Sequence, residues 1–549
     1  MERYRDKLWF SAGLNVLALG VLFLLMGPVY DTDKEAYMLA LVNGALGKND
    51  PHIIFGNCIL GKIYSILYGI FGARFCWYDM FQCALLFAAF TALTYIMIQK
   101  WKSDEGVWIS LILLAVCGYE CYIKMSYIKT AGVAAAAGIL LIVYGASRIK
   151  YARIITGMGI LLSFAGSLYD FKMFMCGALL ILPVCIMVFL NHDNPEQRKK
   201  RHSACCVLTA LIVLMLVSCG ALFADRMVYQ KNESWQKFAE YNEVRDELIA
   251  RGFPEYQKNK ELYEELGIDK KTYRLYQKGA LYDPEKLSTD TLKRLLEQSK
   301  ADGSKEAATG SLRRFVTDSV HSMTFCVFIF AVLLWIISKK KKLFCRAVGI
   351  AELILWLVFS LLAFGKGAGS ETQELLRMIG IIAYLMAMFE NSIVIDRQIC
   401  AALLAGVLVT GQYSWKENWR TDSNEDTATR VFWQQTLGTI AADREHLYLA
   451  MPGAIKYEKI FKVFDSVPTE IMGNNCPLDS WIAASPACVE IMEKFGVNNP
   501  LRDIVGNPLI YLVDDNIEQT LEYIHAYYDK DAKAAVVKQI GEVKIYQIN

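Results

Sequence analysis

Long hydrophobic runs alternate with short charged segments along most of the 549-residue chain. Each run covers about 17 to 22 residues, and a helix needs roughly 20 to cross the hydrocarbon core of a bilayer. The pattern therefore predicts a polytopic α-helical membrane protein with about eleven spans. We expect the spans at residues 8–28, 76–98, 107–123, 127–147, 153–169, 173–190, 204–224, 319–338, 343–364, 375–390 and 396–412.

Polar segments divide these spans into four parts. Residues 1–224 form an N-terminal membrane module, with an acidic first external loop at 29–74. Residues 225–318 are charged and have helical spacing, which predicts a helical insertion. Residues 319–412 are the last spans. In 413–549, stretches typical of strands (459–467, 508–515 and 542–549) and of helices (487–496 and 517–528) alternate, which predicts an α/β domain.

The distribution of Lys and Arg predicts the orientation. Basic clusters such as "MERYRDK", "QKWK", "RIKYAR", "PEQRKKRH" and "KKKKLFCR" fall in alternate connections, which are therefore cytoplasmic. The N-terminus is then cytoplasmic, and the C-terminus and both large polar regions are extracytoplasmic. Residues 51–72 are hydrophobic enough to span. Since a crossing there would invert the basic pattern downstream, we expect a re-entrant or interfacial helix.

Composition excludes several function classes. The net charge is only +2, and no basic surface interleaved with aromatic residues indicates a nucleic-acid partner. Most of the 15 cysteines lie in hydrophobic runs, and no spacing indicates zinc. Cys476 and Cys488 lie in the polar C-terminal part, where a disulfide and two free thiols both remain open. The segment "GKGAG" lacks the spacing of a P-loop.

Three acidic residues follow the first span directly: Asp31, Asp33 and Glu35 in "GPVYDTDKEAYMLALVNGALG". One interpretation is structural, because Asp31 or Thr32 would cap a helix and acids suit its first turn. The other is functional, because carboxylates at the edge of a membrane can act on a substrate held in the lipid.

The order of elements in this loop resembles that of the GT-C superfamily of integral-membrane glycosyltransferases. Asp33 and Glu35 occupy a D-x-E-like position after the first span, and a juxtamembrane helix follows. Pro51-His52 stands where that superfamily has an "hPPl" element, and "GIFGAR" (69–74) ends the next helix before the second span. The segment "ILYGIFGARFCWYDM" is also similar to that of uncharacterised bacterial polytopic membrane proteins.

The resemblance implies a bacterial plasma-membrane enzyme that uses a polyprenyl-phosphate-linked sugar donor. The acceptor would be an extracytoplasmic glycan, lipid or protein. It implies a carboxylate base among Glu35, Asp33 and Asp31, and cations that stabilise the lipid phosphate. A divalent cation, Mg²⁺ or Mn²⁺, is compatible with a D-x-E pair but is not required. The substrate- or phosphate-binding candidates are Lys124, Lys129, Lys172, Lys366, Arg377 and His52.

Two other functions remain open. A transporter or flippase would place ionisable residues deep in its spans, of which Glu352 is the main example. A non-catalytic scaffold or sensor on the same architecture would not need the acids at all.

Overall fold

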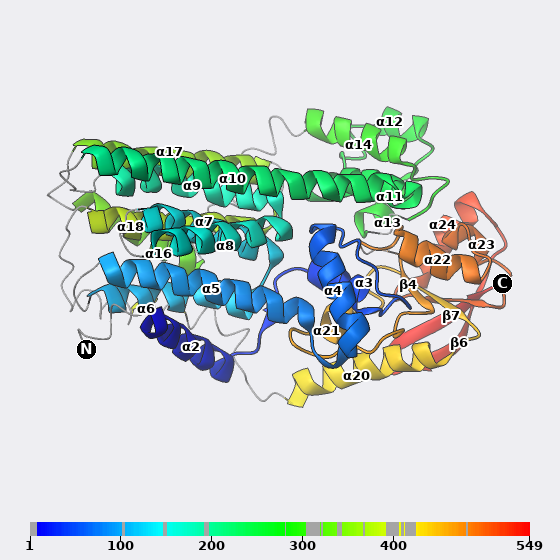
Figure 1. Ribbon diagram of the computed structural model, residues 1–549. Helices are drawn as coiled ribbons and strands as arrows, with labels where there is room; N and C mark the ends of the chain where they lie inside the picture. The colour runs from blue at the N-terminus through cyan, green and yellow to red at the C-terminus, as the bar shows by residue number, and fades with distance from the viewer. Residues whose placement is uncertain are drawn as a thin grey trace.

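The computed structural model describes residues 8–100, 105–146, 151–190, 197–279, 282–302, 319, 322–337, 343–365, 368–390, 406–407, 411, 424–478 and 481–549. One end of the molecule is a bundle of long, roughly aligned helices (Figure 1). The other end holds the C-terminal sheet, the helical insertion and the short helices of residues 29–74, the segment predicted to be the first external loop. The C-terminus lies at the end remote from the bundle (Figure 1).

The bundle confirms the predicted class of a polytopic helical membrane protein. Its helices are α2 (Leu8–Leu25), α5 (Trp77–Lys100), α6 (Glu105–Gly118), α7 (Tyr127–Ala146), α8 (Ala152–Tyr169), α9 (Phe171–Leu190), α10 (Gln197–Gln230), α16 (Met323–Ile337), α17 (Leu343–Gly365) and α18 (Ser370–Glu390). Within the described residues, eight helical segments are long and apolar enough to cross a membrane. They correspond to the first seven predicted spans and to the span at 343–364.

The other three of the eleven predicted spans are not among these eight segments. The segment predicted at 319–338 forms α16, which at 15 residues is shorter than the others. The one predicted at 375–390 falls in α18, whose first half carries Glu371, Glu374 and Arg377. The span predicted at 396–412 lies outside the described residues, except for 406, 407 and 411.

Helix α7 is the centre of the bundle, and its candidate span is entirely buried. Small residues let its neighbours approach closely. A Cβ placed on Gly138 would lie 2.5 Å from the carbonyl oxygen of Gly159 in α8, and one on Gly177 in α9 would lie 2.5 Å from that of Gly132. Close backbone packing through small residues is typical of membrane helices, and it fixes the position of the first turn of α7.

The first external loop contains β1 (Val29–Tyr30), α3 (Lys34–Asn43), α4 (Cys58–Phe71) and a 3₁₀ turn at Gly72–Arg74. Helix α4 lies across the direction of the bundle helices (Figure 1) and has only 14 residues, too few to cross a bilayer. Its exposed face carries Ile66, Ile70 and Phe71, whereas Tyr64 and Tyr68 are buried. This amphipathic pattern is that of an interfacial helix.

The helical insertion continues from the bundle. Helix α10 leads into α11 (Glu233–Arg251), which extends toward the sheet (Figure 1). The side chain of Asn232 caps α11 by accepting from the backbone N–H groups of Ser234 and Trp235. Helices α12 (Lys260–Glu265), α13 (Lys270–Gln277) and α14 (Thr289–Asp302) complete the described part of the insertion.

The C-terminal part is an α/β unit, as expected. Helix α20 (Asn424–Ala442) precedes a five-stranded sheet of order β4-β3-β5-β7-β6. Strands β3 (Leu447–Ala450), β4 (Asn475–Pro477) and β5 (Ile510–Val513) are parallel, and β7 (Val543–Ile548) runs antiparallel to β5 and β6 (Ala534–Ile540). Helices α21 (Tyr457–Ile460), α22 (Pro486–Lys494), α23 (Pro500–Asp503) and α24 (Ile517–Tyr527) connect the strands.

One strand prediction is wrong. Residues 459–467 were expected to form a strand, but they begin in α21 and continue as a loop in which Phe464 has a φ of 64°. This loop is held from outside the domain, because the backbone N–H of Phe464 donates to the Asp79 carboxylate at 2.7 Å. The loop is therefore held on α5 by a backbone hydrogen bond instead of pairing in the sheet.

Candidate functional site

The first external loop is joined to the bundle by a short parallel pair of strands. Strand β1 pairs with β2 (Lys124–Met125), which directly precedes α7, with Val29 opposite Lys124. The backbone N–H of Asp31 extends this pairing by donating to the carbonyl of Met125 at 2.9 Å. The acidic motif is therefore fixed against the first turn of the central helix.

This attachment places Asp31 in a buried ion cluster. The Lys129 ammonium lies 2.8 Å from Asp31 Oδ2 and 2.9 Å from Glu120 Oε2, and its side chain has no exposed surface. Glu120 is presented by a single π-helical turn, Tyr119–Ile123, and its backbone carbonyl also accepts from Lys129 at 3.0 Å. Lys129 is thus neutralised by two carboxylates, and Asp31 is bound to it.

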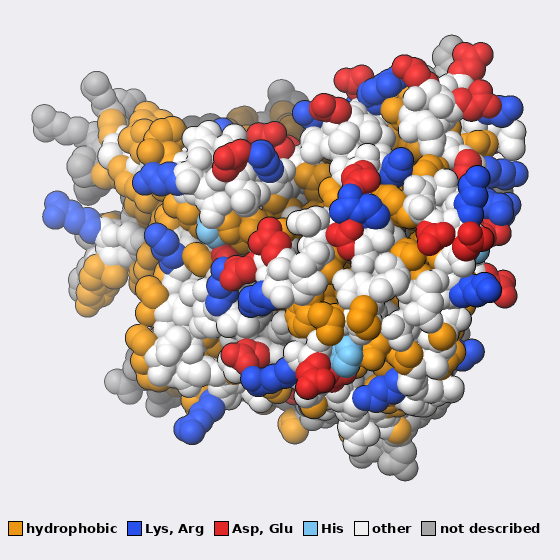
Figure 2. Space-filling view, turned by 90° about the vertical axis from the view of Figure 1, so that its right-hand side faces the viewer, with side chains coloured by type: hydrophobic (Ala, Val, Ile, Leu, Met, Phe, Trp, Pro, Cys, Tyr) orange, Lys and Arg blue, Asp and Glu red, His pale blue; other side chains and the backbone are white. Residues whose placement is uncertain are grey.

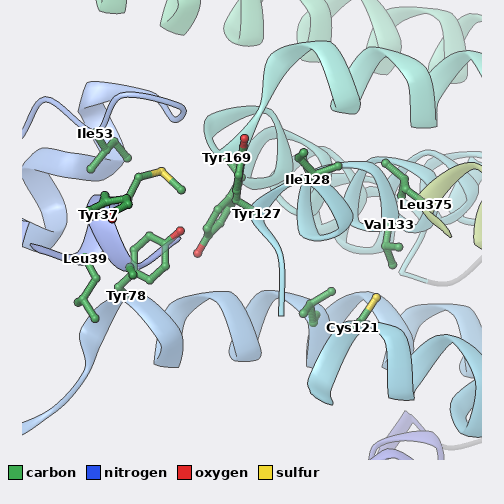
Figure 3. Close-up of a cluster of buried hydrophobic side chains, with 14 of the residues drawn as sticks. Tyr37, Leu39, Ile53, Tyr78, Cys121, Tyr127, Ile128, Val133, Tyr169 and Leu375 are labelled. Carbon is green, nitrogen blue, oxygen red and sulfur yellow. The ribbon is translucent and has the colours of Figure 1, made fainter. Parts of the chain in front are cut away.

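Glu35 is fully buried in the first turn of α3. Its carboxylate accepts from the Tyr78 hydroxyl and from the backbone N–H of Tyr127. The side chains of Tyr78, Tyr127 and Tyr169 gather where α3 faces α5, α7 and α8 (Figure 3). Burial raises the pKa of Glu35 to about 8 although these donors oppose the shift, so the carboxyl is largely protonated at neutral pH.

Asp33 is the exposed acid of the motif. Its Oδ1 accepts from the indole Nε1 of Trp481 at 3.3 Å, which ties the loop to the C-terminal domain. The surrounding protein raises the pKa of Asp33, and the Trp481 donor and the Lys34 charge oppose that rise. Trp481 follows β4, so it lies beyond the carboxyl end of the parallel strands, where ligands of α/β sheets commonly bind.

Lys34 lies between the two aromatic rings that cover the motif. Its ammonium is 4.4 Å from the centroid of Phe55 and 4.5 Å from a ring centroid of Trp481. It also pairs with Asp246 of α11 at 2.9 Å. Three regions that are distant in the sequence, the first external loop, the insertion and the C-terminal domain, therefore meet at this one cation.

Two further acids lie within electrostatic reach of Lys34. Burial raises the pKa values of Asp170, at the junction of α8 and α9, and of Glu371, at the start of α18. The Lys34 charge opposes both shifts. The acidic motif thus faces further carboxylates from α8–α9, α11 and α18. Among the residues that the structure describes, however, no group of three or more His, Cys, Asp and Glu is arranged to hold a metal ion.

The predicted cations have different partners. Arg377 is buried and donates to Glu374 at 2.6 Å and to Ser319 at 2.7 Å. Lys124 is half-buried and Lys172 is exposed, and within the described part of the chain neither forms a salt bridge. Lys366 lies outside the described residues. His52 lies apart from the acids, with its Nδ1 2.6 Å from Asp50 and its ring stacked on Trp235 at 4.5 Å.

Sequence reasoning missed Lys34 and Trp481. Lys34 stands inside the acidic motif itself, so its place between Asp33 and Glu35 was a usable signal. Trp481 lies more than 400 positions from the motif, and no local pattern marks it. The two cysteines left open, Cys476 and Cys488, are buried free thiols, with the Cys476 Sγ 3.5 Å from the Cys488 carbonyl oxygen.

Comparisons with known proteins show the following. No protein-family model matches the sequence, and no curated protein matches it. Among solved structures, the chain is similar to ArnT from Cupriavidus metallidurans bound to undecaprenyl phosphate, with a TM-score of 0.38 and 11% identity over 98% of this chain and 97% of that one. At that level of likeness, the function of this chain has to be argued from its own residues.

Proposed function

We propose that this protein is a membrane glycosyltransferase of the GT-C type that moves a sugar from a polyprenyl-phosphate-linked donor to an extracytoplasmic acceptor. The observation that carries the proposal is Asp33. It is an exposed carboxylate directly after the first membrane helix, held beneath an aromatic side chain of the C-terminal domain and beside a cation. A donor anchored in the lipid would reach this boundary, whereas a soluble substrate would not need it.

In this proposal Asp33 is the general base that takes the proton from the acceptor hydroxyl as it attacks the anomeric carbon. The bond between that carbon and the phosphate oxygen breaks, and negative charge develops on the lipid phosphate. Lys124 and Lys172 are the cations assigned to that charge, because neither is paired with a carboxylate in the described chain. Glu35 and Asp31 are assigned to positioning, because both are held by internal partners.

The acceptor, the sugar and the requirement for Mg²⁺ or Mn²⁺ belong to the proposal and are open to experiment, as is the orientation with the N-terminus in the cytoplasm.

The test of the proposed function is a gene deletion complemented with wild type, Asp33→Asn or the exposed control Glu240→Gln. Loss of one defined sugar from the cell surface, restored by wild type and the control but not by Asp33→Asn, supports transfer. An unchanged glycan profile in the deletion strain overturns it. Membranes assayed with Mg²⁺, Mn²⁺ or EDTA decide the metal question.

One observation favours transport as a second candidate. Glu352 lies in the middle of α17, is 1% exposed, and neither of its carboxylate oxygens has a hydrogen-bond partner among the described residues. Ionisable groups deep in a membrane helix often mark a translocation path. Glu352→Gln separates the two candidates, because it would abolish transport of a lipid-linked glycan but leave sugar transfer at Asp33 intact.

A further inference from the structure

A separate pocket lies beside α11. Its volume is about 730 Å³, within the range of small-molecule sites. It is bounded by residues 48–52 of the first external loop, by residues 232–241 and 282–289 of the insertion, and by residues 484–493 of the C-terminal domain. Three distant segments therefore build one cavity, and none of its lining residues belongs to a candidate membrane span.

Aromatic side chains form the floor and one wall of this pocket. Trp235 and Phe238 are almost fully buried and meet edge to face, with ring centroids 5.6 Å apart. Tyr241 follows on the same helix, and the half-buried Tyr282 forms part of the wall. Of these rings, the half-buried Tyr282 keeps exposed surface, and an aromatic ring with a polar edge suits the C–H face of a sugar ring.

The wall residue Tyr282 is held in place through its neighbour Asp283. Asp283, which adjoins Tyr282, is 2% exposed and accepts hydrogen bonds from Tyr523 at 2.6 Å, from Tyr528 at 2.5 Å and from Asn499 at 3.0 Å. It also accepts from the backbone N–H groups of Glu285 and Lys286. The position of Tyr282 is therefore fixed by the C-terminal domain before any ligand arrives, which lowers the entropic cost of binding.

The charges that line the pocket disfavour an anionic ligand. Lys48 pairs with Glu490, Lys237 pairs with Glu233 at 2.6 Å, and His52 is held by Asp50. Each basic side chain of the lining already has an acidic partner, so none is left over for an anion. The end of the molecule that includes this region carries acidic and basic side chains intermixed, with hydrophobic side chains between them (Figure 2).

A chain of side chains links the pocket to Asp33. The Arg245 guanidinium lies 5.2 Å from the Tyr241 ring and 5.5 Å from a Trp481 ring, and it donates to the Trp481 carbonyl at 2.9 Å. Trp481 in turn donates to Asp33. Along α11, Tyr241 precedes Asp246, the partner of Lys34, by roughly 8 Å of helix rise. A ligand in the pocket can therefore extend one end toward the acids.

We propose that this pocket binds the neutral, hydroxyl-rich end of a carbohydrate acceptor and directs one of its hydroxyl groups toward Asp33. The inference rests on the proposed function and names its acceptor as a glycan. The pocket supplies apolar contact and paired polar groups, and the base lies next to it. A lipid acceptor would instead require a site lined by membrane helices.

The test measures binding directly, so that it does not depend on turnover. Full-length protein in lipid nanodiscs is exposed to neutral trisaccharides (maltotriose, chitotriose and mannotriose), to a uronic-acid trisaccharide and to a neutral hexapeptide, and saturation-transfer NMR detects contact. Ala484→Trp and Ser288→Trp fill the pocket from two sides, and Tyr282→Ala removes its wall. Ala250→Trp, on the exposed end of α11, is the matched control.

The expected result is contact with at least one neutral trisaccharide that falls at least tenfold in the three pocket variants and is unchanged in Ala250→Trp. Equal or stronger contact with the anionic trisaccharide, contact with the peptide alone, or no contact with any neutral sugar overturns the proposal. Sugar binding by the protein in nanodiscs, together with no sugar transfer in wild-type cells, would refute the glycosyltransferase and leave the pocket standing.

Discussion

The indole Nε1 of Trp481 lies 3.3 Å from Oδ1 of Asp33, so one hydrogen bond joins the C-terminal domain to the acid that follows the first membrane helix. The same indole covers Lys34. The C-terminal domain is thus part of the candidate site and does more than extend the chain beyond the membrane.

Trp481→Phe removes that hydrogen bond but keeps an aromatic ring over Lys34. A hydrogen bond to a charged group contributes about 1.5–3 kcal/mol, so we expect transfer activity to fall roughly 10- to 100-fold. The Trp481 donor lowers the pKa of Asp33, so its loss raises that pKa. Since the base must be deprotonated, the acid limb of the kcat/KM profile should move to higher pH. A uniform fall in activity with an unchanged profile would contradict a role acting through Asp33.

Lys34 and Asp246 provide a test of how the insertion is held to the motif. The Lys34 side chain is 17% exposed and that of Asp246 is 41% exposed, so their pair is partly screened. We expect a double-mutant cycle of Lys34→Met and Asp246→Ala to give a coupling of about 0.5–1 kcal/mol in thermal unfolding. Lys34→Met should cost more than Asp246→Ala, because it also removes the contacts with Phe55 and Trp481. A coupling near zero would show that the observed pair does not fasten α11.

Different parts of this structure were visible in the sequence to different degrees. The spans, the amphipathic helix at 58–71 and the helices at 486–494 and 517–527 follow from hydrophobic length and period, which are local properties. The role of 459–467 was not visible, because its contacts are with distant helices: Phe464 packs on Phe23 of α2 and its backbone N–H donates to Asp79 of α5. The acids were found because they interrupt a membrane pattern. Their partners lie from 43 positions away, for Tyr78 and Glu35, to 448 positions away, for Trp481 and Asp33, so no local pattern marks them.

Substitution of Lys129 tests whether this residue has a structural role or binds the lipid phosphate. Its substitution by Met leaves the buried carboxylates of Asp31 and Glu120 without a cation, which should cost about 3–5 kcal/mol. We therefore expect Lys129→Met to lower the unfolding temperature and the yield of folded protein. Adding Asp31→Asn and Glu120→Gln should restore most of both, because no unpaired charge then remains. The matched variant Lys172→Met, at an exposed position, should leave stability unchanged and raise the KM for the donor. If Lys129→Met raised the KM for the donor at unchanged stability, Lys129 would be a phosphate ligand instead.

Because of Glu35, the free energy of unfolding should fall as the pH rises. Burial raises its pKa from 4.5 to about 8, so between these values the folded protein keeps a proton that the unfolded chain releases. The folded state binds more protons there, and raising the pH therefore favours unfolding. The contribution is fully present below about pH 4.5 and is lost progressively as the pH rises to about 8, by an amount on the order of 5 kcal/mol. Glu35→Gln can still accept from the Tyr127 N–H and can donate to Tyr78, so it should fold and should show a smaller decline in unfolding temperature between pH 5 and pH 8.

The transfer activity of Glu35→Gln should stay within about tenfold of wild type, whereas Asp33→Asn should lose about 10²- to 10⁴-fold, the usual contribution of a general base. The opposite order of activities would make Glu35 the base and Asp33 its positioning partner.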